Sequence, residues 1–573
     1  MMALAIAMVM VICTMNFTVF AEPSQPNPPQ ADTTITITEL DAGDTVNLYK
    51  VLEWKDGEGW RLTADFASLS NNATIKKFTN PEKGQAVVEM DKETLDAIAT
   101  AAKNANPVNP TGNKVAEGAT SYTYTTYSAT DPVVDRPGMY VALIEPAVAG
   151  VVYNPIVVSA DYESKNATNT ISSSAEIRTS EGAAVVKAIA KKKKITVEKT
   201  EPKITNDIND VYTFTINTTI PVYADSYTST YFTLTDEVGD YLEFIKDDDS
   251  LKVTAGGNDI TATATTNTFA AGNNKFTLGW NHDYIKGLAA AQDITITYKA
   301  KLAVTKEEAA ELPNVKEEYN RVTIEFPNNP KDDTGKGAIK DETREYTFTI
   351  DGNLFGKKDW QTAEIVKVGV DNAGNPIESM VDYKNGSSFA ALDGAEFGLY
   401  TDPDCQTLYS NEAFKGKVTT ANGGLMTIPG LDVGTYYLKE LTAPKGYIKD
   451  GDAHKIEITA KFKDTEVTEY FDGTEWSKVQ KNKGDIAYTY TLRTLESYTV
   501  TVDGNKSTYN MTLSGPSISS VTPGDSSTAI ANTKGVELPA TGGIGTTIFY
   551  VIGTILVLGA GILLVTRRRM NME

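Results

Sequence analysis

The sequence contains very little cysteine and histidine. Its 573 residues include two of each, Cys13 and Cys405 together with His282 and His454. Cys13 lies in an N-terminal apolar run that we expect to be removed, so the mature chain keeps one cysteine and cannot form an internal disulfide. Two histidines supply little material for a Ser-His-Asp site or a histidine-rich metal site, and we expect no metal. The secreted chain therefore needs another source of stability.

Basic residues are outnumbered by acidic ones. Lys and Arg total 53 against 75 Asp and Glu, which gives a net charge of −22. Such a chain repels nucleic-acid phosphate, so nucleic acid is excluded as a partner. The sequence also lacks a Walker loop, a dinucleotide fingerprint and a zinc-ligand spacing, and we expect no cofactor. No pair of acids stands out as the machinery of a secreted hydrolase.

The N-terminus has the pattern of a secretory signal. An apolar run ends at Val19-Phe20-Ala21, whose small residues predict cleavage after Ala21, so residues 1–21 form the signal peptide. No Lys or Arg precedes this run, which is atypical. Residues 22–32 contain four prolines and predict a stiff, extended leader.

Alternating apolar and polar residues predict β-strands over most of the remaining chain. Runs such as 34–38, 212–217, 294–298 and 322–326 have period two, with frequent turn residues between them. We expect one helix near 95–102, where apolar residues recur at helical spacing before Pro107. Composition shifts predict β domains over 33–188, 195–327 and 341–535, with a polar linker from Pro327 to Lys340. Short strands at regular spacing favour a β-sandwich in each domain.

The C-terminus combines three features in a fixed order. Leu538, Pro539, Ala540, Thr541 and Gly542 come first, an apolar run from Ile544 to Val565 follows, and Arg567–Arg569 ends the series. The apolar run is long enough to cross a bilayer, which takes about 20 residues. The arginines stand where positive charge stops transfer. A plain tail anchor with a chance pentapeptide is the competing interpretation.

This arrangement, over 538–573, resembles the LPxTG cell-wall sorting signal of Gram-positive surface proteins. The resemblance implies that a sortase cysteine attacks the bond between Thr541 and Gly542 and passes the threonyl group to an amine. This cleavage would separate the membrane span, 544–565, from the rest of the chain.

Two further stretches resemble domains of sortase-assembled pilins. The run from Tyr436 to Tyr447 matches the "E box" of the Cna B-type domain, and Tyr319–Ile324 with the linker that follows matches the pilin D2 domain. The chain therefore resembles a shaft (backbone) pilin. The expected fold is all-β: tandem Ig-like sandwiches of the Cna type, with a signal peptide and a C-terminal transmembrane sorting helix.

The resemblance implies an intramolecular Lys–Asn isopeptide bond, promoted by a buried acid, in two of the domains. A lysine attacks only when neutral, and burial favours the neutral forms of both amine and carboxyl. Folding supplies the effective molarity. The resemblance assigns Lys199, Asp236 and Asn320 in the second domain, and Lys367, Glu440 and Asn532 in the third, with Lys357 and Lys358 as rival amines. The competing interpretation is solvated lysines and turn asparagines.

A basic run lies between the first two domains, where shaft pilins carry the lysine that accepts the next subunit. Lys191 ends a stretch, from Val186, that keeps the alternation of the family's motif but lacks its Tyr and Pro. We assign Lys191 as the pilus-linking residue, with Lys187, Lys192, Lys193 and Lys194 as alternatives. A solvated linker run is equally compatible with the sequence.

The sequence thus predicts a structural subunit of a covalently linked pilus, anchored to peptidoglycan and supporting adhesion. It is not an enzyme, since each cross-link forms once, but it is a substrate of sortases. The expected partners are pilus-type and housekeeping sortases, identical subunits, minor pilins, peptidoglycan and host surface ligands. The alternative is a wall-anchored adhesin or minor pilin that does not polymerise.

Overall fold

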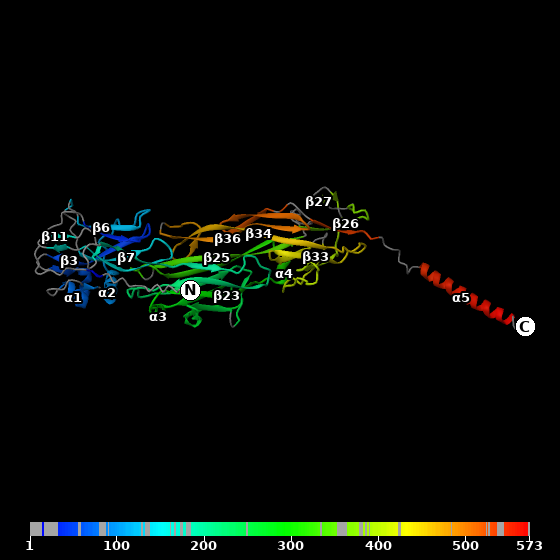
Figure 1. Ribbon diagram of the computed structural model, residues 1–573, viewed down its shortest axis with the longest axis horizontal. Helices are drawn as coiled ribbons and strands as arrows, with labels where there is room; N and C mark the ends of the chain where they lie inside the picture. Colours follow the sequence, from blue (N-terminus) through cyan, green and yellow to red (C-terminus); the bar gives the residue numbers. More distant parts are fainter. Residues whose placement is uncertain are drawn as a thin grey trace.

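A computed structural model describes Thr14–Met15 and residues 33–535 and 544–570. Within these ranges it leaves out 56–58, 80–87, 90, 128–129, 132–137, 161, 166–167, 172–175, 179–184, 248–249, 333–334, 352–363, 378–381, 384–386, 389, 422–425, 483, 523 and 525–527. The described chain is an elongated rod of β-sheet followed by one long helix (Figure 1). The predicted signal peptide, apart from two residues, and the predicted leader lie outside the described residues, as does the pentapeptide 538–542.

The N-terminal part of the rod has two four-stranded sheets, in the orders β12-β13-β2-β6 and β4-β3-β7-β9. The predicted helix is confirmed as α2, and Asp91 caps it by accepting a hydrogen bond from the Thr94 N–H at 2.7 Å. The elements are β1 (Thr14–Met15), β2 (Thr33–Thr38), β3 (Thr45–Lys55), β4 (Gly59–Leu62), η1 (Ala64–Asn71), α1 (Ala73–Thr79), β5 (Val88–Glu89), α2 (Lys92–Ala102), β6 (Ser121–Tyr127), β7 (Gly138–Glu145), β8 (Val151–Asn154), β9 (Ile156–Ala160), β10 (Tyr162–Lys165), β11 (Thr168–Ile171), β12 (Glu176–Arg178), β13 (Val185–Ile189) and β14 (Lys191–Lys194).

The middle part is a sandwich of two antiparallel sheets. One has the order β15-β16-β23-β19-β20 and the other begins β21-β22-β17-β24-β25. Buried and exposed residues alternate along β16 and β17, as the period-two pattern predicted. Phe214, Phe276 and Trp280 are among the large side chains of the core. The elements are β15 (Val197–Thr200), β16 (Val211–Ile220), β17 (Phe232–Val238), β18 (Leu242–Phe244), β19 (Leu251–Ala255), β20 (Asn258–Asp259), η2 (Thr261–Thr263), β21 (Thr266–Asn267), β22 (Lys275–Trp280), α3 (His282–Lys286), β23 (Gln292–Leu302), α4 (Lys306–Ala309) and β24 (Val315–Pro327).

Strand β25 (Lys336–Asp351) passes through the predicted linker. It pairs with β24 along its whole length except its last three residues, and Phe348, Ile350 and Asp351 then pair with β32 of the third domain. One strand therefore pairs with strands of two domains, within a single sheet. The sequence predicted a linker from Pro327 to Lys340 because this stretch is polar, but Lys340 is buried in the structure.

The C-terminal part holds a sheet of order β31-β30-β33-β34-β36-β37-β38 and a second sheet, β29-β26-β39, in which β26 and β39 run parallel. The elements are β26 (Ile365–Val370), β27 (Asp382–Tyr383), β28 (Ser387–Ser388), β29 (Ala390–Ala391), β30 (Glu396–Tyr400), β31 (Lys417–Thr419), β32 (Thr427–Leu431), β33 (Gly434–Thr442), β34 (Ala453–Phe471), β35 (Trp476–Ser477), β36 (Ile486–Val502), β37 (Asn505–Ser514), β38 (Ser517–Thr522) and β39 (Thr528–Thr533). The predicted all-β class is confirmed.

The hairpin of β34 and β36 extends from the third domain back over the second. Its far end pairs Phe471 with Ile486, and Ile486 and Tyr488 pack against the core of the second domain. Figure 1 shows the two long strands lying along β25. We call the part of this hairpin from Phe462 to Thr494 the overlay hairpin.

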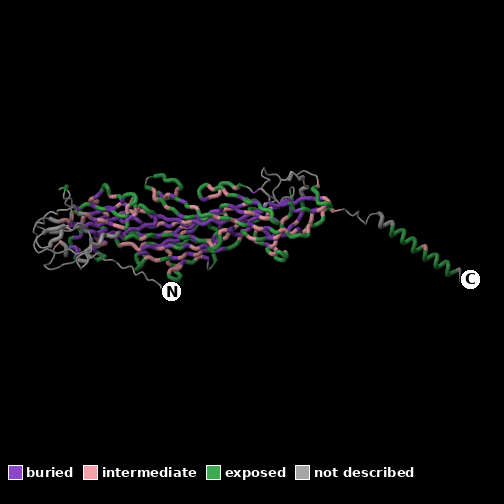
Figure 2. The backbone as a smooth tube through the Cα atoms, turned by 45° about the horizontal axis from the view of Figure 1, so that its top comes forward, coloured by how far each residue is buried: buried purple, intermediate pink, exposed green. Residues whose placement is uncertain are grey.

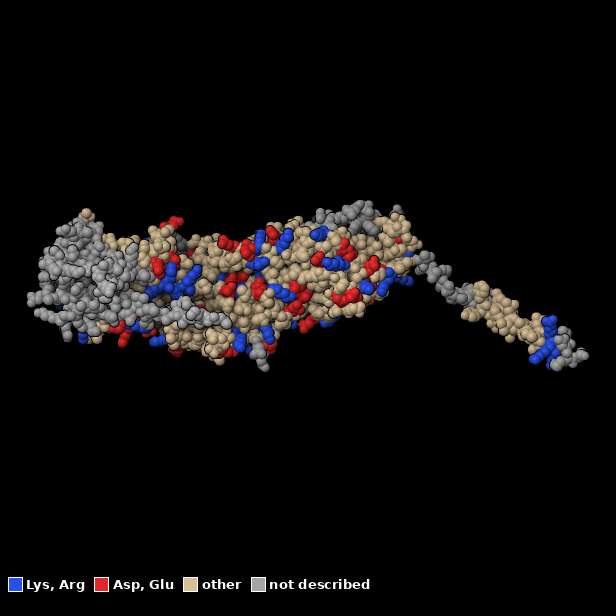
Figure 3. Space-filling view, viewed as in Figure 1, with Lys and Arg blue, Asp and Glu red and all other residues tan. Residues whose placement is uncertain are grey.

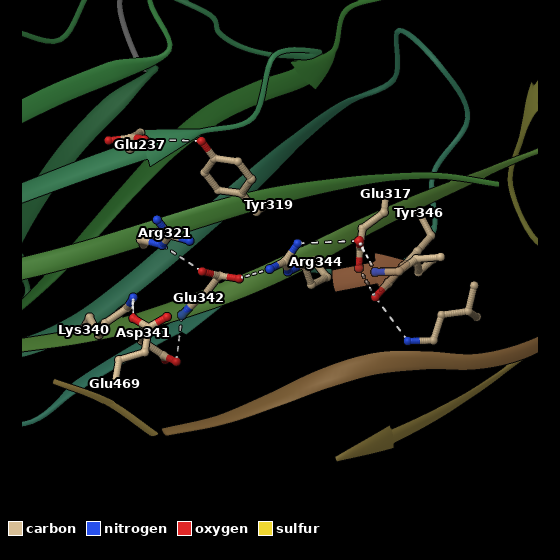
Figure 4. Close-up of polar contacts among 12 residues, drawn as sticks. Glu237, Glu317, Tyr319, Arg321, Lys340, Asp341, Glu342, Arg344, Tyr346 and Glu469 are labelled. Atoms are coloured by element: carbon tan, nitrogen blue, oxygen red, sulfur yellow. Dashed lines mark hydrogen bonds and ion pairs between the residues drawn. The ribbon is translucent and has the colours of Figure 1, made fainter. Parts of the chain in front are cut away.

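Charged residues of β25 face the overlay hairpin. Lys340 forms an ion pair with Glu469 of the hairpin, and the two side chains are 1% and 6% exposed. Farther along the strand, Glu342 accepts from Arg321 Nε at 2.8 Å and pairs with Arg344 at 2.5 Å (Figure 4). Because side chains alternate along a strand, the residues between them face the other way, toward the sandwich. The end of the predicted linker, at Lys340, is thus part of a buried interface, which its composition alone could not reveal.

The last described element, α5 (Ile544–Met570), projects from the end of the rod and is exposed along its described side chains (Figure 2). Phe549–Arg569 has a mean hydropathy of 2.3 and is long and apolar enough to cross a membrane. The helix includes the apolar run predicted over 544–565.

Removing one partner of the Lys340–Glu469 pair should destabilise the rod. Lys340→Met leaves the Glu469 carboxylate buried without its counter-charge, which costs about 3–5 kcal/mol of the free energy of unfolding. Guanidinium titration measures this loss. The matched control is Lys455→Met, whose partner Glu457 is 3.7 Å away on the same hairpin and exposed, where about 0–1 kcal/mol is expected. Equal losses in both variants would contradict a buried interdomain clamp.

Candidate functional site

The second domain brings Lys199, Asp236 and Asn320 together inside its sandwich. Lys199 lies on β15 in one sheet, and Asp236 and Asn320 lie on the neighbouring strands β17 and β24 of the other. The three residues are 5%, 0% and 0% exposed. The alternation of each strand points these polar side chains inward among apolar ones, so a link between Lys199 and Asn320 would join the two sheets.

A tyrosine that the sequence analysis did not assign connects these three residues. Tyr298 of β23 places its hydroxyl 2.6 Å from Lys199 Nζ and 2.8 Å from Asp236 Oδ1. The same hydroxyl lies 2.9 Å from Oδ1 and 2.7 Å from Nδ2 of Asn320. Asp236 in turn accepts a hydrogen bond from Lys199 Nζ through Oδ2. The signal was present in the alternation Ile294, Ile296, Tyr298, which places the tyrosine on the inward face.

Burial sets the charge state of this site. It lowers the pKa of Lys199, against the opposing effect of Asp236, and raises the pKa of the Asp236 carboxyl. Both directions favour a neutral amine beside a protonated acid. The rings of Phe214 and Tyr298 lie 5.3 and 4.9 Å from Lys199 Nζ and keep water away from it.

The third domain brings Lys367, Glu440 and Asn532 together in a different way. Lys367 and Asn532 lie on the parallel neighbours β26 and β39, and Glu440 faces them from β33. Lys367 and Glu440 are 0% exposed and Asn532 is 1% exposed. Lys367 Nζ is 3.3 Å from Glu440 Oε1, and Asn532 Nδ2 donates to Glu440 Oε2 at 2.7 Å. Here the carboxyl contacts both the amine and the amide directly.

The surroundings of the third-domain site hold its groups in place. Burial lowers the pKa of Lys367, and the ring of Phe397 lies 5.4 Å from its amine. The N–H of Asp450 donates to Glu440 Oε2 at 2.6 Å, and Asn532 Nδ2 also donates to the Ile448 carbonyl at 2.7 Å. The loop after the E box therefore closes over the site. The rival amines at 357 and 358 lie outside the described residues.

Each site can form an amide between its lysine and asparagine. Burial lowers the pKa of each amine and so favours its neutral form, the amide lies in the same cluster of buried side chains, and an acid stands beside them. No step of this chemistry needs a metal or cofactor. Among the described residues, no group of three or more His, Cys, Asp or Glu is placed to hold a metal ion.

The basic run forms strand β14 instead of an unpaired linker. Residues 191–194 pair with β8, with Lys191 opposite Asn154. Lys191, Lys192 and Lys194 are exposed, and Lys192 Nζ also contacts the Asp41 carboxylate at 3.0 Å. The alternative Lys187 lies on β13, and its side chain is outside the described residues. Figure 3 shows basic side chains gathered beside the grey N-terminal end of the rod, and mixed charges farther along it.

Two family models match the C-terminal half of the chain. Residues 381–470 match the SpaA model, a prealbumin-like fold domain, and residues 531–571 match the LPXTG cell wall anchor motif. The trypsin-resistant surface T6 protein of Streptococcus pyogenes serotype M6 is 25% identical, over 93% of this chain and 95% of that protein.

Solved structures of pilins are also similar to this chain. The T6 backbone pilin of serotype M6 Streptococcus pyogenes is 19% identical with a TM-score of 0.48, covering 88% of this chain and 98% of that one. The major pilin SpaD of Corynebacterium diphtheriae is 21% identical with a TM-score of 0.42, covering 74% and 91%.

The anchor motif, the SpaA-type domain and the full-length T6 relative together support an LPXTG-anchored major pilin. The anchor motif and the exposed apolar helix α5 support attachment to the cell wall. This is the class of protein that the resemblance in the sequence indicated.

The acids around Lys199 should make the stability depend on pH. Burial raises the pKa of Glu201 from 4.5 to about 7 and that of Asp341 to about 6. A raised folded-state pKa means that the folded chain holds the proton more tightly, so this stability is fully present below the unfolded pKa and is lost as pH rises through about 7. The thermal midpoint should fall between about pH 4.5 and 7. Glu201→Gln should flatten this fall in calorimetry, while Glu307→Gln, at an exposed position on α4, should not; identical slopes would contradict the assignment.

Proposed function

We propose that this chain is the repeating subunit of a covalent pilus whose domains are closed by Lys–Asn isopeptide bonds. The observation that carries the proposal is that each of two domains buries a lysine beside an acid and an asparagine. Hydrogen bonds join the three residues in the second domain, and in the third an ion pair joins Lys367 to Glu440, which accepts a hydrogen bond from Asn532. Burying a lysine as an ammonium costs desolvation free energy, and each buried polar neighbour also needs a hydrogen-bond partner. Such a group is therefore an expensive way to fill a core.

The reaction balances without any co-reactant. The neutral lysine Nζ attacks the asparagine Cγ, the Cγ–Nδ2 bond breaks, and a proton moves from the attacking nitrogen to the leaving one. The products are one amide and one ammonia. The acid favours attack by hydrogen-bonding the amide, and the fold replaces a bimolecular encounter with fixed contact. Each site reacts once, so the chain is the substrate of its own chemistry and is not an enzyme.

The positions of the two bonds suit a fibre under tension. Lys199 lies on the first strand of the second domain, and Asn320 lies on β24, directly before the strand that enters the third domain. A covalent link between them would pass force across the domain without unfolding it. Lys367 and Asn532 likewise stand on the first and last strands of the third domain's small sheet, and the chain leaves toward the anchor after Asn532.

Polymer growth would join a point beyond the third domain to a point between the first and second domains. A sortase would cleave after Thr541, beyond the third domain in the sequence, and pass the threonyl group to an amine near Lys191 on β14, between the first and second domains. Joining different surfaces head to tail extends a fibre without closing a ring. Sortases, identical subunits, minor pilins and peptidoglycan are the partners in this proposal, and host surface ligands would meet the fibre. A wall-anchored adhesin or minor pilin that does not polymerise is the alternative.

The folded protein should weigh less than its sequence by two ammonia molecules. Asp236→Ala should abolish the loss from the second domain, and Glu440→Ala the loss from the third, along with much of the resistance to heat and protease. Intact mass and mapping of the Lys199–Asn320 and Lys367–Asn532 peptides measure both. The exposed Glu466→Ala on β34 should keep both losses. A parent protein with its full sequence mass would disprove the cross-links.

Wall extracts should contain a ladder of covalent multimers in which Thr541 is joined to a lysine of the 187–194 region. Replacing Lys187 and Lys191–Lys194 with alanine should leave wall-anchored monomer, and restoring Lys191 alone should restore the ladder. A control variant replaces five exposed lysines elsewhere, namely Lys252, Lys275, Lys286, Lys306 and Lys415, and should polymerise normally. A ladder in the first variant would mean that another lysine is used, and a single band in the parent would favour the adhesin.

A further inference from the structure

The two buried sites solve the same chemical problem with different sets of groups. In the third domain, Glu440 contacts both the amine of Lys367 and the amide of Asn532. In the second domain, Asp236 contacts the amine of Lys199, but no hydrogen bond among the described residues joins Asp236 directly to Asn320. The hydroxyl of Tyr298 lies between them instead and contacts all three side chains. The carboxyl alone therefore cannot deliver a proton to the amide in this domain.

The Tyr298 hydroxyl lies between the attacking nitrogen and the leaving one. It is 2.6 Å from Lys199 Nζ and 2.7 Å from Asn320 Nδ2. Amide exchange requires a proton to pass from the first nitrogen to the second, and a hydroxyl in contact with both can accept one proton while it gives up another. The same hydroxyl is 2.9 Å from Asn320 Oδ1, where negative charge develops during attack.

From this geometry we propose that Tyr298 is a catalytic residue of the second-domain cross-link, acting as the proton relay between Lys199 and Asn320. As Nζ bonds to Cγ, the hydroxyl receives a proton from Nζ and donates its own to Nδ2, and the Cγ–Nδ2 bond breaks to release ammonia. Tyr298 ends the reaction with its hydroxyl unchanged. Asp236 Oδ1 lies 2.8 Å from the same hydroxyl and helps to position it. The inference rests on the proposed cross-link and adds a fourth residue to it.

The surroundings of Tyr298 fit this role. The side chain is 1% exposed, and its ring stacks on Phe214 at 5.4 Å between centroids, with an edge contact to Phe276 at 5.2 Å. The hydroxyl therefore has little freedom to leave the site. Burial raises the tyrosine pKa well above its usual value, so the hydroxyl keeps the proton that a relay must donate. In the third domain the aromatic side chain beside the lysine is Phe397, which has no hydroxyl.

The test compares Tyr298→Phe with Tyr212→Phe in the full chain. Tyr212 is a buried tyrosine on the neighbouring strand β16, and its hydroxyl contacts none of the reacting groups. The mass of each protein is followed with time after synthesis, and the Lys199–Asn320 peptide is mapped. Tyr298→Phe should slow the second-domain ammonia loss by a factor of about 10²–10⁴, the usual contribution of proton transfer. Tyr212→Phe should lose both ammonia molecules at the parent's rate.

The third-domain bond in the same molecules reports whether the variant chain has folded. In Tyr298→Phe, a normal third-domain loss with a second-domain loss slower than the parent's supports the relay. A second-domain loss at the parent's rate overturns it. If the parent itself lacks the second-domain loss, the cross-link fails and the relay with it, which is a distinct result. If the phenylalanine variant does not fold, 3,5-difluorotyrosine at position 298 replaces it. This side chain keeps the hydroxyl but makes it more acidic. A relay hydroxyl stops donating once it ionises, so the pH at which the second-domain ammonia loss slows should be lower than in the parent. An unchanged dependence of this rate on pH overturns the relay.

Discussion

The burial of two lysine amines is the constraint on which the rest of this structure depends. An ammonium in a protein core is strongly disfavoured unless it is paired, and the usual outcome is a shift toward the neutral amine. Lys199 and Lys367 are both enclosed by strands of opposing sheets and both face a carboxyl. The same burial that makes each pair costly as ions lowers the pKa of each amine and favours its neutral form, and Cys405, the cysteine among the described residues, is free.

The two sites differ in which side chains contact the amine and the amide, because their lysine and asparagine strands are arranged differently. In the third domain the lysine and asparagine strands are parallel neighbours, so one glutamate on the opposite sheet reaches both. In the second domain the lysine and asparagine stand on opposite sheets, and Tyr298 fills the space that Asp236 does not span. A comparable local chemistry is thus reached through two geometries.

Stiffness along the rod comes from strands shared between domains. β25 pairs with β24 of the second domain and, at its end, with β32 of the third domain, so β32 extends the second domain's sheet. The overlay hairpin returns over the second domain and buries the Lys340–Glu469 pair against it. At the other junction, the Tyr227 hydroxyl donates to the Tyr153 carbonyl at 2.9 Å, joining the second domain to the first. These contacts give the domains a fixed order and direction, which a head-to-tail fibre requires.

The sequence by itself determined the all-β class, the helix near 95–102, the strands of the second domain and the anchor, because these follow from local periodicity and from residues adjacent in the chain. Its resemblance to pilins also selected six buried site residues that the structure brings together. Only the tertiary structure decided the rest. The stretch around Lys340 resembles a linker until the overlay hairpin supplies Glu469, which lies far away in the sequence. Tyr298 is one of many inward-facing strand residues until the facing sheets place its hydroxyl among Lys199, Asp236 and Asn320. Periodicity specifies which face a side chain occupies, whereas its partners depend on how separate strands pack.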